Sequence, residues 1–386
     1  MSTSEQKVGA VAPVRLGIDV LAETGFAQLT GLRIGLLTND SSRDGSGRRT
    51  LDVLTRAPGV RLAALFTPEH GLGADKDGKV ASGRHAETGL PIYSLYGAHR
   101  RPRPDMLSGL DAVVIDIQDV GVRFYTYATT MGYVMEAAAQ HRLKVFVLDR
   151  PNPIGAGSVR GPMLDPDLRS FTGYFPMPVQ HGMTIGELAR MFNGEMRIGA
   201  DLMVVAMRGY RRQSWFDELG LPWVNPSPNL RSLRGAILYP GVALIEFTDV
   251  SVGRGTPSPF EVVGAPWIDG AALAQYLQRR QVPGVAFNSV VFTPTADRHA
   301  RQRCSGVQID LADRMALDAP RLGVELAAAL HRLHPQRFAL RDVLTLLGSH
   351  RTIDAIASGE DPAAIAESWR AGIEGFTAVR GKYLLY

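Results

Sequence analysis

Glutamate and histidine stand side by side at Glu69-His70, where an apolar stretch of the chain stops. Residues 60–66 hold six apolar residues and one arginine, which predicts a buried strand, and Pro68 should end it because proline cannot donate to a sheet ladder. We therefore expect both side chains on a loop at the strand's carboxyl end, where α/β sheets commonly bind ligands. The pair is a candidate for acid–base catalysis, with a helix-capping Glu69 beside a surface His70 as the alternative.

Polar side chains also follow three other predicted strands, which span residues 33–39, 112–119 and 144–149. In a parallel sheet the carboxyl ends of the strands share one edge, so these side chains are expected to form a polar cleft with Glu69 and His70. A single buried aspartate could equally serve as a structural hydrogen-bonding group. The side chains concerned are Asn39, Asp116, Asp119, Asp149 and Arg150.

His181 stands just ahead of Thr184-Ile185-Gly186-Glu187, the pattern of a capping box that begins a helix. The positive end of a helix dipole favours a neutral imidazole, which suits acid–base chemistry, although a structural histidine fits as well. The glycine-rich loop 71–89 is longer than an inert connection and is typical of a lid or binding loop. It carries His85, which could take part in binding or equally be a solvated loop residue.

The second half of the chain offers fewer polar groups. Residues 241–247 predict a strand interrupted by Glu246, a carboxylate that needs a partner or a function if it points inward. The loop 251–257 presents Arg254. Asn229 lies near Trp215 and Trp223, and aromatic faces beside amide groups suit a sugar, with hydrophobic cover between domains as the alternative.

Strands that alternate with helices, such as the one predicted at 127–141, indicate an α/β fold with a parallel sheet covered on both faces. At 386 residues the chain exceeds the usual size of a single core, and two domains are expected, the second of α+β type.

The composition excludes several functional classes. The net charge of +4 comes without a long basic helix, which argues against nucleic acid and allows an anionic substrate. A single cysteine excludes an internal disulfide and a multi-cysteine metal site. Dinucleotide, Walker, H-E-x-x-H and G-x-S-x-G motifs are absent, and no stretch predicts a signal peptide or membrane insertion. As written the chain is expected to be cytoplasmic, or periplasmic or secreted if a leader was removed.

The chain carries a series of motifs along its length: Leu36-Leu37-Thr38-Asn39, Pro68-Glu69-His70-Gly71, the segment 116–127, Leu148-Asp149-Arg150-Pro151-Asn152-Pro153, His181-Gly182-Met183-Thr184, Pro226-Ser227-Pro228-Asn229 and Gly253-Arg254-Gly255-Thr256. Taken in order, these motifs resemble those of the NamZ-like exo-β-N-acetylmuramidases. The resemblance runs from Leu32 to Tyr386 and implies a Rossmann-like catalytic domain (31–238) after a lead-in (1–30), a smaller C-terminal domain (239–386), and an active-site cleft between them. It also implies release of N-acetylmuramic acid from the non-reducing ends of peptidoglycan fragments, without a cofactor.

The chain departs from the family pattern at two places. Asp40-Ser41-Ser42 stands where the family usually has Gln-Thr-Gly, which could retune a sugar subsite. Val252 stands where the family has a glutamate, so that position is not expected to be essential for chemistry, whereas Glu246 matches the pattern.

Glycoside hydrolysis needs an acid for the leaving oxygen and a second group for the anomeric carbon. We expect Glu69 to be the general acid/base, with His70 or His181 setting its protonation. Asp116 and Asp119 are candidates for the second carboxylate or for holding hydroxyl groups, unless the acetamido oxygen of the sugar attacks.

Substrate binding is expected from the remaining polar side chains of the motifs. Arginine matches a carboxylate, so an arginine is expected to bind the lactyl group of the sugar, with Arg123 and Arg254 preferred over Arg150. A binding protein for cell-wall fragments and a metal-dependent hydrolase built on Asp116, Asp119, His70 and His181 are the competing functions. The other expected substrate-binding residues are Asn39, Tyr125, Asp149, Asn229 and Glu246.

Overall fold

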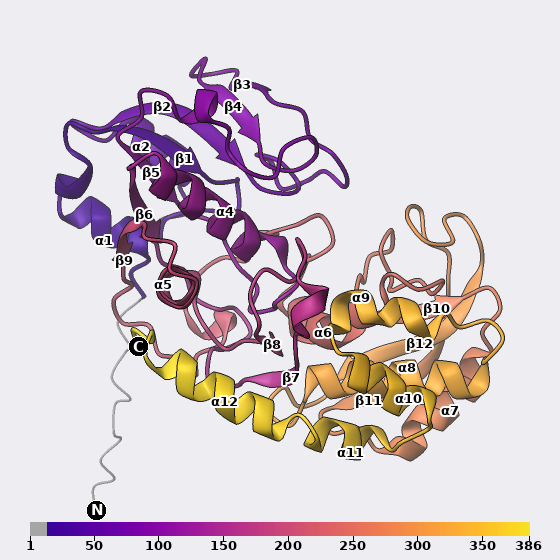
Figure 1. Ribbon diagram of the computed structural model, residues 1–386. Coiled ribbons are helices and arrows are strands. Elements are labelled where there is room, and N and C mark those ends of the chain that lie inside the picture. Colours follow the sequence, from indigo (N-terminus) through magenta and orange to yellow (C-terminus); the bar gives the residue numbers. More distant parts are fainter. Residues whose placement is uncertain (1–13) are drawn as a thin grey trace, which may run out of the picture.

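The structure is a computed structural model that describes residues 14–386 (Figure 1). Its first half is built on a seven-stranded sheet in the order β3-β4-β2-β1-β5-β6-β9, in which every neighbouring pair is parallel except β3 with β4. The expected α/β fold is thus confirmed. The strands are β1 (Arg33–Leu37), β2 (Arg61–Thr67), β3 (Gly83–Arg84), β4 (Pro91–Ser94), β5 (Ala112–Ile115), β6 (Lys144–Leu148) and β9 (Asp201–Val205).

Helices cover both faces of this sheet. Successive side chains of a strand point to opposite faces, so Leu36 joins one hydrophobic core and Leu37 the other. The first core includes α1 (Gly17–Glu23) and α2 (Thr50–Thr55), and the second includes α4 (Thr126–Gln140) and α5 (Ile185–Glu195). Burial on both faces explains why these strands read as continuous apolar runs.

The predicted capping box begins α5. The Glu187 backbone N–H donates to Thr184 Oγ1 at 3.3 Å, and the Thr184 N–H donates to the Glu187 carboxylate at 3.0 Å. Two of the orphan N–H groups of the helix are satisfied in this way.

The second half holds a three-stranded antiparallel sheet packed with helices. Its strand order is β10-β12-β11, and the expected α+β character is confirmed. Its elements are α6 (Leu233–Val242), η4 (Ala243–Ile245), β10 (Val262–Ala265), α7 (Gly270–Arg280), β11 (Val285–Phe292), β12 (Cys304–Leu311), α8 (Ala319–Leu333), η5 (Leu340–Val343), α9 (Leu344–Leu347), α10 (His350–Ala357), α11 (Pro362–Glu367) and α12 (Arg370–Gly381).

The prediction of a strand at residues 241–247 is wrong. Residues 241–242 end α6 and residues 243–245 form η4, and these five residues are apolar because all of them are buried. Gly241 lies against α8 so closely that a Cβ would come within 2.0 Å of the Ala319 carbonyl oxygen. A short apolar run does not distinguish a buried helix from a buried strand, which accounts for the error.

Residues 383–386 return from α12 to the first half of the chain (Figure 1). The Tyr386 hydroxyl donates to Asp149 Oδ2 at 2.8 Å, and the Leu385 N–H donates to Glu187 Oε1 at 2.8 Å. Arg190 donates to the carbonyl oxygens of Tyr383 and Leu384. The two halves are therefore joined by a strap of backbone and side-chain hydrogen bonds.

Of the predicted lead-in 1–30, residues 1–13 lie outside the described residues. Residues 14–30 belong to the first half: Arg15 pairs with Arg208 through two backbone hydrogen bonds, and α1 packs on the sheet. No helix within residues 14–386 is long and apolar enough to cross a membrane. The remaining short elements are η1 (Ala27–Leu29), α3 (Pro104–Leu107), β7 (Arg160–Met163), η2 (Pro166–Leu168), β8 (Pro178–Gln180) and η3 (Phe216–Glu218).

Candidate active site

A cavity of about 290 Å³ lies between the two halves of the chain. Its volume is near the lower end of the range of about 300–1,000 Å³ that is usual for ligand sites. The first half contributes Glu69, His70 and Asn229, and the second contributes Glu246 and Arg254. These five predicted residues, together with Tyr125, therefore come together from both halves of the chain.

A larger hollow of about 630 Å³ lies beside α1 and α2, but it contains no aromatic face apart from Phe26. Its charged groups bind one another, as Arg49 does with Asp52 at 2.8 Å. We therefore place the candidate site in the smaller cavity.

Glu69 follows β2 at the carboxyl edge of the sheet, as expected. Thr126, the first residue of α4, donates a 2.6 Å hydrogen bond from its hydroxyl to Glu69 Oε2. The carboxylate is half-buried and faces the cavity, so one oxygen is held while the group stays accessible to a ligand.

Tyr96 shares this wall of the cavity with Glu69 and Thr126. Burial, together with a hydrogen bond to the Glu69 carboxylate, raises the pKa of Tyr96 to about 12. The phenol therefore stays protonated at neutral pH and acts as a donor toward Glu69.

Glu246 and Arg254, which line the cavity from the second half of the chain, form an ion pair. Burial raises the pKa of the Glu246 carboxyl, and the positive charge of Arg254 counteracts part of that increase. Burial alone would lower the pKa of Arg254, but the carboxylates of Glu246 and Asp297 outweigh it and raise that pKa above its ordinary value. Arg254 Nε lies 2.8 Å from Asp297 Oδ2, so the guanidinium is held from several sides.

The other strand-end carboxylates do not line the cavity, which corrects the expected position of the second catalytic group. Asp116 is fully buried and binds Arg150, whose Nη2 donates to Oδ2 at 2.9 Å. Asp119 Oδ2 lies 3.3 Å from His181 Nε2, and both residues are buried. None of these four side chains lines the cavity that holds Glu69.

Arg123, Asp149 and Asn39 do not line the cavity either, and each is engaged inside the protein. Arg123 is 1% exposed and donates to four backbone carbonyl oxygens, those of Pro162, Met177, Leu346 and Leu347. Asp149 accepts hydrogen bonds from the start of α5 and from Tyr386, and burial raises its pKa to about 6. Asn39 donates to the Tyr127 hydroxyl at 2.8 Å.

Sequence reasoning missed Tyr96, Asp77, Thr126 and Tyr239, which also line the cavity. Tyr96 follows the short strand β4, so the strand-end rule applied there would have found it. Asp77 belongs to the long loop that the sequence marks as a lid or binding loop. Tyr239 lies within apolar α6, where no pattern points to a ligand.

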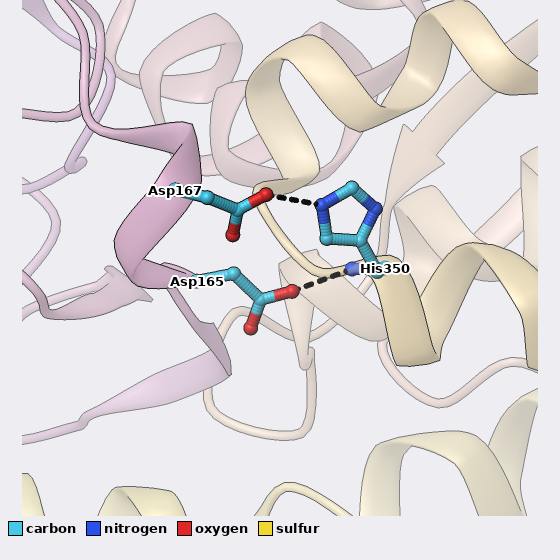
Figure 2. Close-up of side chains that lie close together, drawn as sticks. All are labelled: Asp165, Asp167 and His350. Atoms are coloured by element: carbon cyan, nitrogen blue, oxygen red, sulfur yellow. Dashed lines mark hydrogen bonds and ion pairs between the residues drawn. The ribbon is translucent and has the colours of Figure 1, made fainter.

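The four residues of the expected metal site do not form one cluster: Asp119 meets His181, whereas Asp116 binds Arg150 and His70 lines the cavity. Within residues 14–386, the group of metal-ligating side chains that does come together is Asp165, Asp167 and His350 (Figure 2). Asp167 Oδ2 lies 2.8 Å from His350 Nε2, and Asp165 Oδ2 accepts from the His350 N–H at 2.7 Å. None of the three lines the cavity; they tie η2 to the start of α10.

A parallel α/β domain joined to a smaller α+β domain, with two glutamates lining a cavity between them, defines a two-domain protein of the α/β class. Family models described as exo-beta-N-acetylmuramidase NamZ, N-terminal and C-terminal, match residues 34–234 and 237–386. The chain belongs to this family, and the resemblance drawn from the sequence is confirmed.

Individual relatives agree with the family assignment. The chain is 41% identical to the peptidoglycan beta-N-acetylmuramidase NamZ of Bacillus subtilis (strain 168), over 99% of this chain and 94% of the relative. Two crystal structures of DUF1343 family proteins from Bacteroides fragilis have TM-scores of 0.89 and 0.79 at 33% and 32% identity. Each covers 97% of this chain and 99% of its own.

Proposed function

We propose that the protein is an exo-acting glycoside hydrolase that releases N-acetylmuramic acid from the non-reducing ends of peptidoglycan fragments. The observation that carries the proposal is the Glu69 carboxylate, held by Thr126 on the wall of a small cavity between the two domains. The similarity to a peptidoglycan beta-N-acetylmuramidase supplies the substrate.

Glu69 is the general acid/base in this proposal. It protonates the leaving glycosidic oxygen and then takes a proton from the attacking group. Thr126 and Tyr96 orient the carboxylate from two sides, which keeps it in one geometry during the proton transfer.

The other residues that line the cavity position the sugar. Glu246 is the other glutamate that lines the cavity, and its ion pair with Arg254 fixes it there. Tyr125, Tyr239 and Phe247 supply aromatic faces against which the apolar face of a sugar ring can pack, and Asn229 supplies an amide for its polar substituents.

The test is replacement of Glu69 by glutamine, which keeps the shape of the side chain but removes its acid–base function. We expect Glu69→Gln to lower kcat on a chromogenic N-acetylmuramide by about 10²- to 10⁴-fold while binding of N-acetylmuramic acid is retained. Glu360→Gln, at an exposed glutamate away from the cavity, is the matched control.

Two results would contradict the proposal. Unchanged turnover of Glu69→Gln would remove Glu69 from the mechanism. A wild-type protein that binds muramides but releases no sugar from any of them would instead be a binding protein for cell-wall fragments.

A further inference from the structure

Asp77 places a carboxylate of the protein inside the cavity, among three groups that recognise anions. Asn229 Nδ2 lies 3.2 Å from Asp77 Oδ2, and Arg254 Nη2 lies 3.3 Å from Asp77 Oδ1. His70 Nδ1 is 3.8 Å from the same Oδ1. An amide, a guanidinium and an imidazole around one carboxylate make up a donor set suited to a carboxylate ligand.

The segment that carries Asp77 is weakly anchored. Residues 71–82 form neither helix nor strand, and the Asp77 side chain is 47% exposed. The ends of the segment are held: the Asp40 N–H donates to the Leu72 carbonyl oxygen at 2.7 Å, and the Ser94 N–H donates to Ser82 Oγ at 3.1 Å. Between them residues 75–79 are exposed, and beside the contacts of Asp77 they are held by a 2.8 Å hydrogen bond between His70 Nδ1 and the Lys76 carbonyl oxygen. Segments with few buried contacts open at low free energy, so Asp77 can leave the cavity without disturbing the sheet.

The charges around Arg254 favour an exchange of one carboxylate for another. Its guanidinium faces Glu246, Asp297 and Asp77, which is one cation for three carboxylates. Glu246 is fixed at the end of η4, and Asp297 does not line the cavity. Asp77 is thus the carboxylate that both occupies the ligand space and sits on a segment able to move, and its replacement by a ligand carboxylate leaves the local charge unchanged.

We propose that Asp77 is an internal stand-in for the carboxylate of the substrate. It occupies a subsite made by Arg254, Asn229 and His70, and it withdraws with residues 75–79 when a sugar that carries a carboxylate binds. The identity of that sugar rests on the proposed function, in which the lactyl group of N-acetylmuramic acid supplies the carboxylate. N-Acetylglucosamine lacks this group and does not compete with Asp77.

When an internal group competes with the ligand, the apparent dissociation constant equals the intrinsic one divided by the fraction of molecules in which the subsite is free. If Asp77 fills the subsite in about nine molecules of ten, its removal tightens binding of the carboxylate sugar roughly tenfold. The same change leaves the affinity for N-acetylglucosamine as it was.

The experiment measures equilibrium binding of N-acetylmuramic acid and N-acetylglucosamine by calorimetry, with wild type, Asp77→Ala and Asp75→Ala. Asp75 is an exposed aspartate of the same segment that does not line the cavity, so Asp75→Ala is the matched control. We expect Asp77→Ala alone to bind N-acetylmuramic acid roughly tenfold more tightly. Melting temperatures of the three proteins confirm that each is folded.

Three results would overturn the inference. Asp77→Ala could bind N-acetylmuramic acid no more tightly than wild type does, or it could gain as much affinity for N-acetylglucosamine as for N-acetylmuramic acid. The third is that neither wild type nor Asp77→Ala binds N-acetylmuramic acid. The calorimetry measures binding and does not depend on turnover. The result for the Asp77 subsite can therefore be told apart from a failure of the proposed hydrolase function. A protein that hydrolyses no muramide but shows the selective gain keeps the subsite and loses only the hydrolase assignment.

Discussion

Oγ1 of Thr126 lies 2.6 Å from Oε2 of Glu69, and the hydrogen bond joins two residues 57 positions apart in the chain. One comes from the start of α4 and the other from the loop after β2, so the sheet and its covering helix together fix the carboxylate. The geometry of the acid therefore depends on packing between these elements as well as on the local loop.

Replacing Thr126 by valine keeps the shape of the side chain and removes the donor. A hydrogen bond to a charged group contributes about 1.5–3 kcal/mol, so kcat/KM on an N-acetylmuramide should fall roughly 10- to 100-fold. Thr129→Val, at a buried threonine of the same helix that does not line the cavity, should leave kcat/KM near the wild-type value. Equal losses in both variants would point to general damage to α4 instead.

Tyr96→Phe tests the second donor to Glu69. We expect kcat/KM to fall roughly tenfold, since one hydrogen bond to the carboxylate is lost. Because the pKa of Tyr96 is raised to about 12, the ratio of wild-type to variant activity should stay constant from neutral pH well into the alkaline range. A ratio that shrinks near about pH 10, the usual pKa of tyrosine, would show that the phenol is not shielded. Tyr93→Phe, on β4 and outside the cavity, is the control.

Arg123→Met should cost stability and leave substrate affinity intact. The substitution removes the donor from four buried carbonyl oxygens, which is expected to lower the free energy of unfolding by about 3–5 kcal/mol. Denaturant unfolding measures the loss, with Arg370→Met at an exposed arginine as the control. A variant of normal stability that no longer binds N-acetylmuramic acid would restore Arg123 as a substrate-binding residue.

The contact between His350 and Asp167 should make stability depend on pH. The hydrogen bond to Asp167 raises the pKa of His350 above 6.5, so its contribution is complete below 6.5 and is lost as the pH rises through the folded-state value. The same bond lowers the pKa of Asp167 below 3.8, so that contribution is lost as the pH falls through the folded-state value. The contact is therefore strongest between these limits.

The measurement compares the melting temperature of wild type and His350→Gln across this pH range. The difference should be largest between about pH 4 and pH 6.5 and disappear at alkaline pH. His141→Gln, at an exposed histidine at the end of α4, should show no such window. A difference that is constant with pH would mean that the histidine contributes through packing alone.

The sequence was sufficient to predict the parallel sheet, because strands buried on both faces are apolar throughout and stop at polar residues. It also predicted that Glu69 lies at the carboxyl edge of β2, which the structure confirms. The rule that polar residues after apolar strands gather at one edge of the sheet does not say which of these residues face a ligand. Asp116 and Glu69 both follow strands, but Arg150 and Thr50 surround Asp116 inside the protein.

The partner of a carboxylate depends on three-dimensional packing, and no local pattern encodes it. Asp119 meets His181 from 62 positions along the chain, and Arg123 meets Leu346 from more than two hundred. Glu246 lines the cavity although it follows a helix and not a strand as predicted, because a helix end presents it there as well as a strand would have done.

The strap formed by residues 383–386 bears on how the chain reaches its native state. The Asp149 carboxylate at the end of β6 receives the Tyr386 hydroxyl, which is translated 237 positions later. Contacts of such long sequence separation slow folding, because the intervening chain must be ordered before they form. The two domains are thus not independent modules: a fragment that contained the parallel sheet alone would leave Asp149 and Glu187 short of donors and could be rescued by adding the strap as a separate peptide.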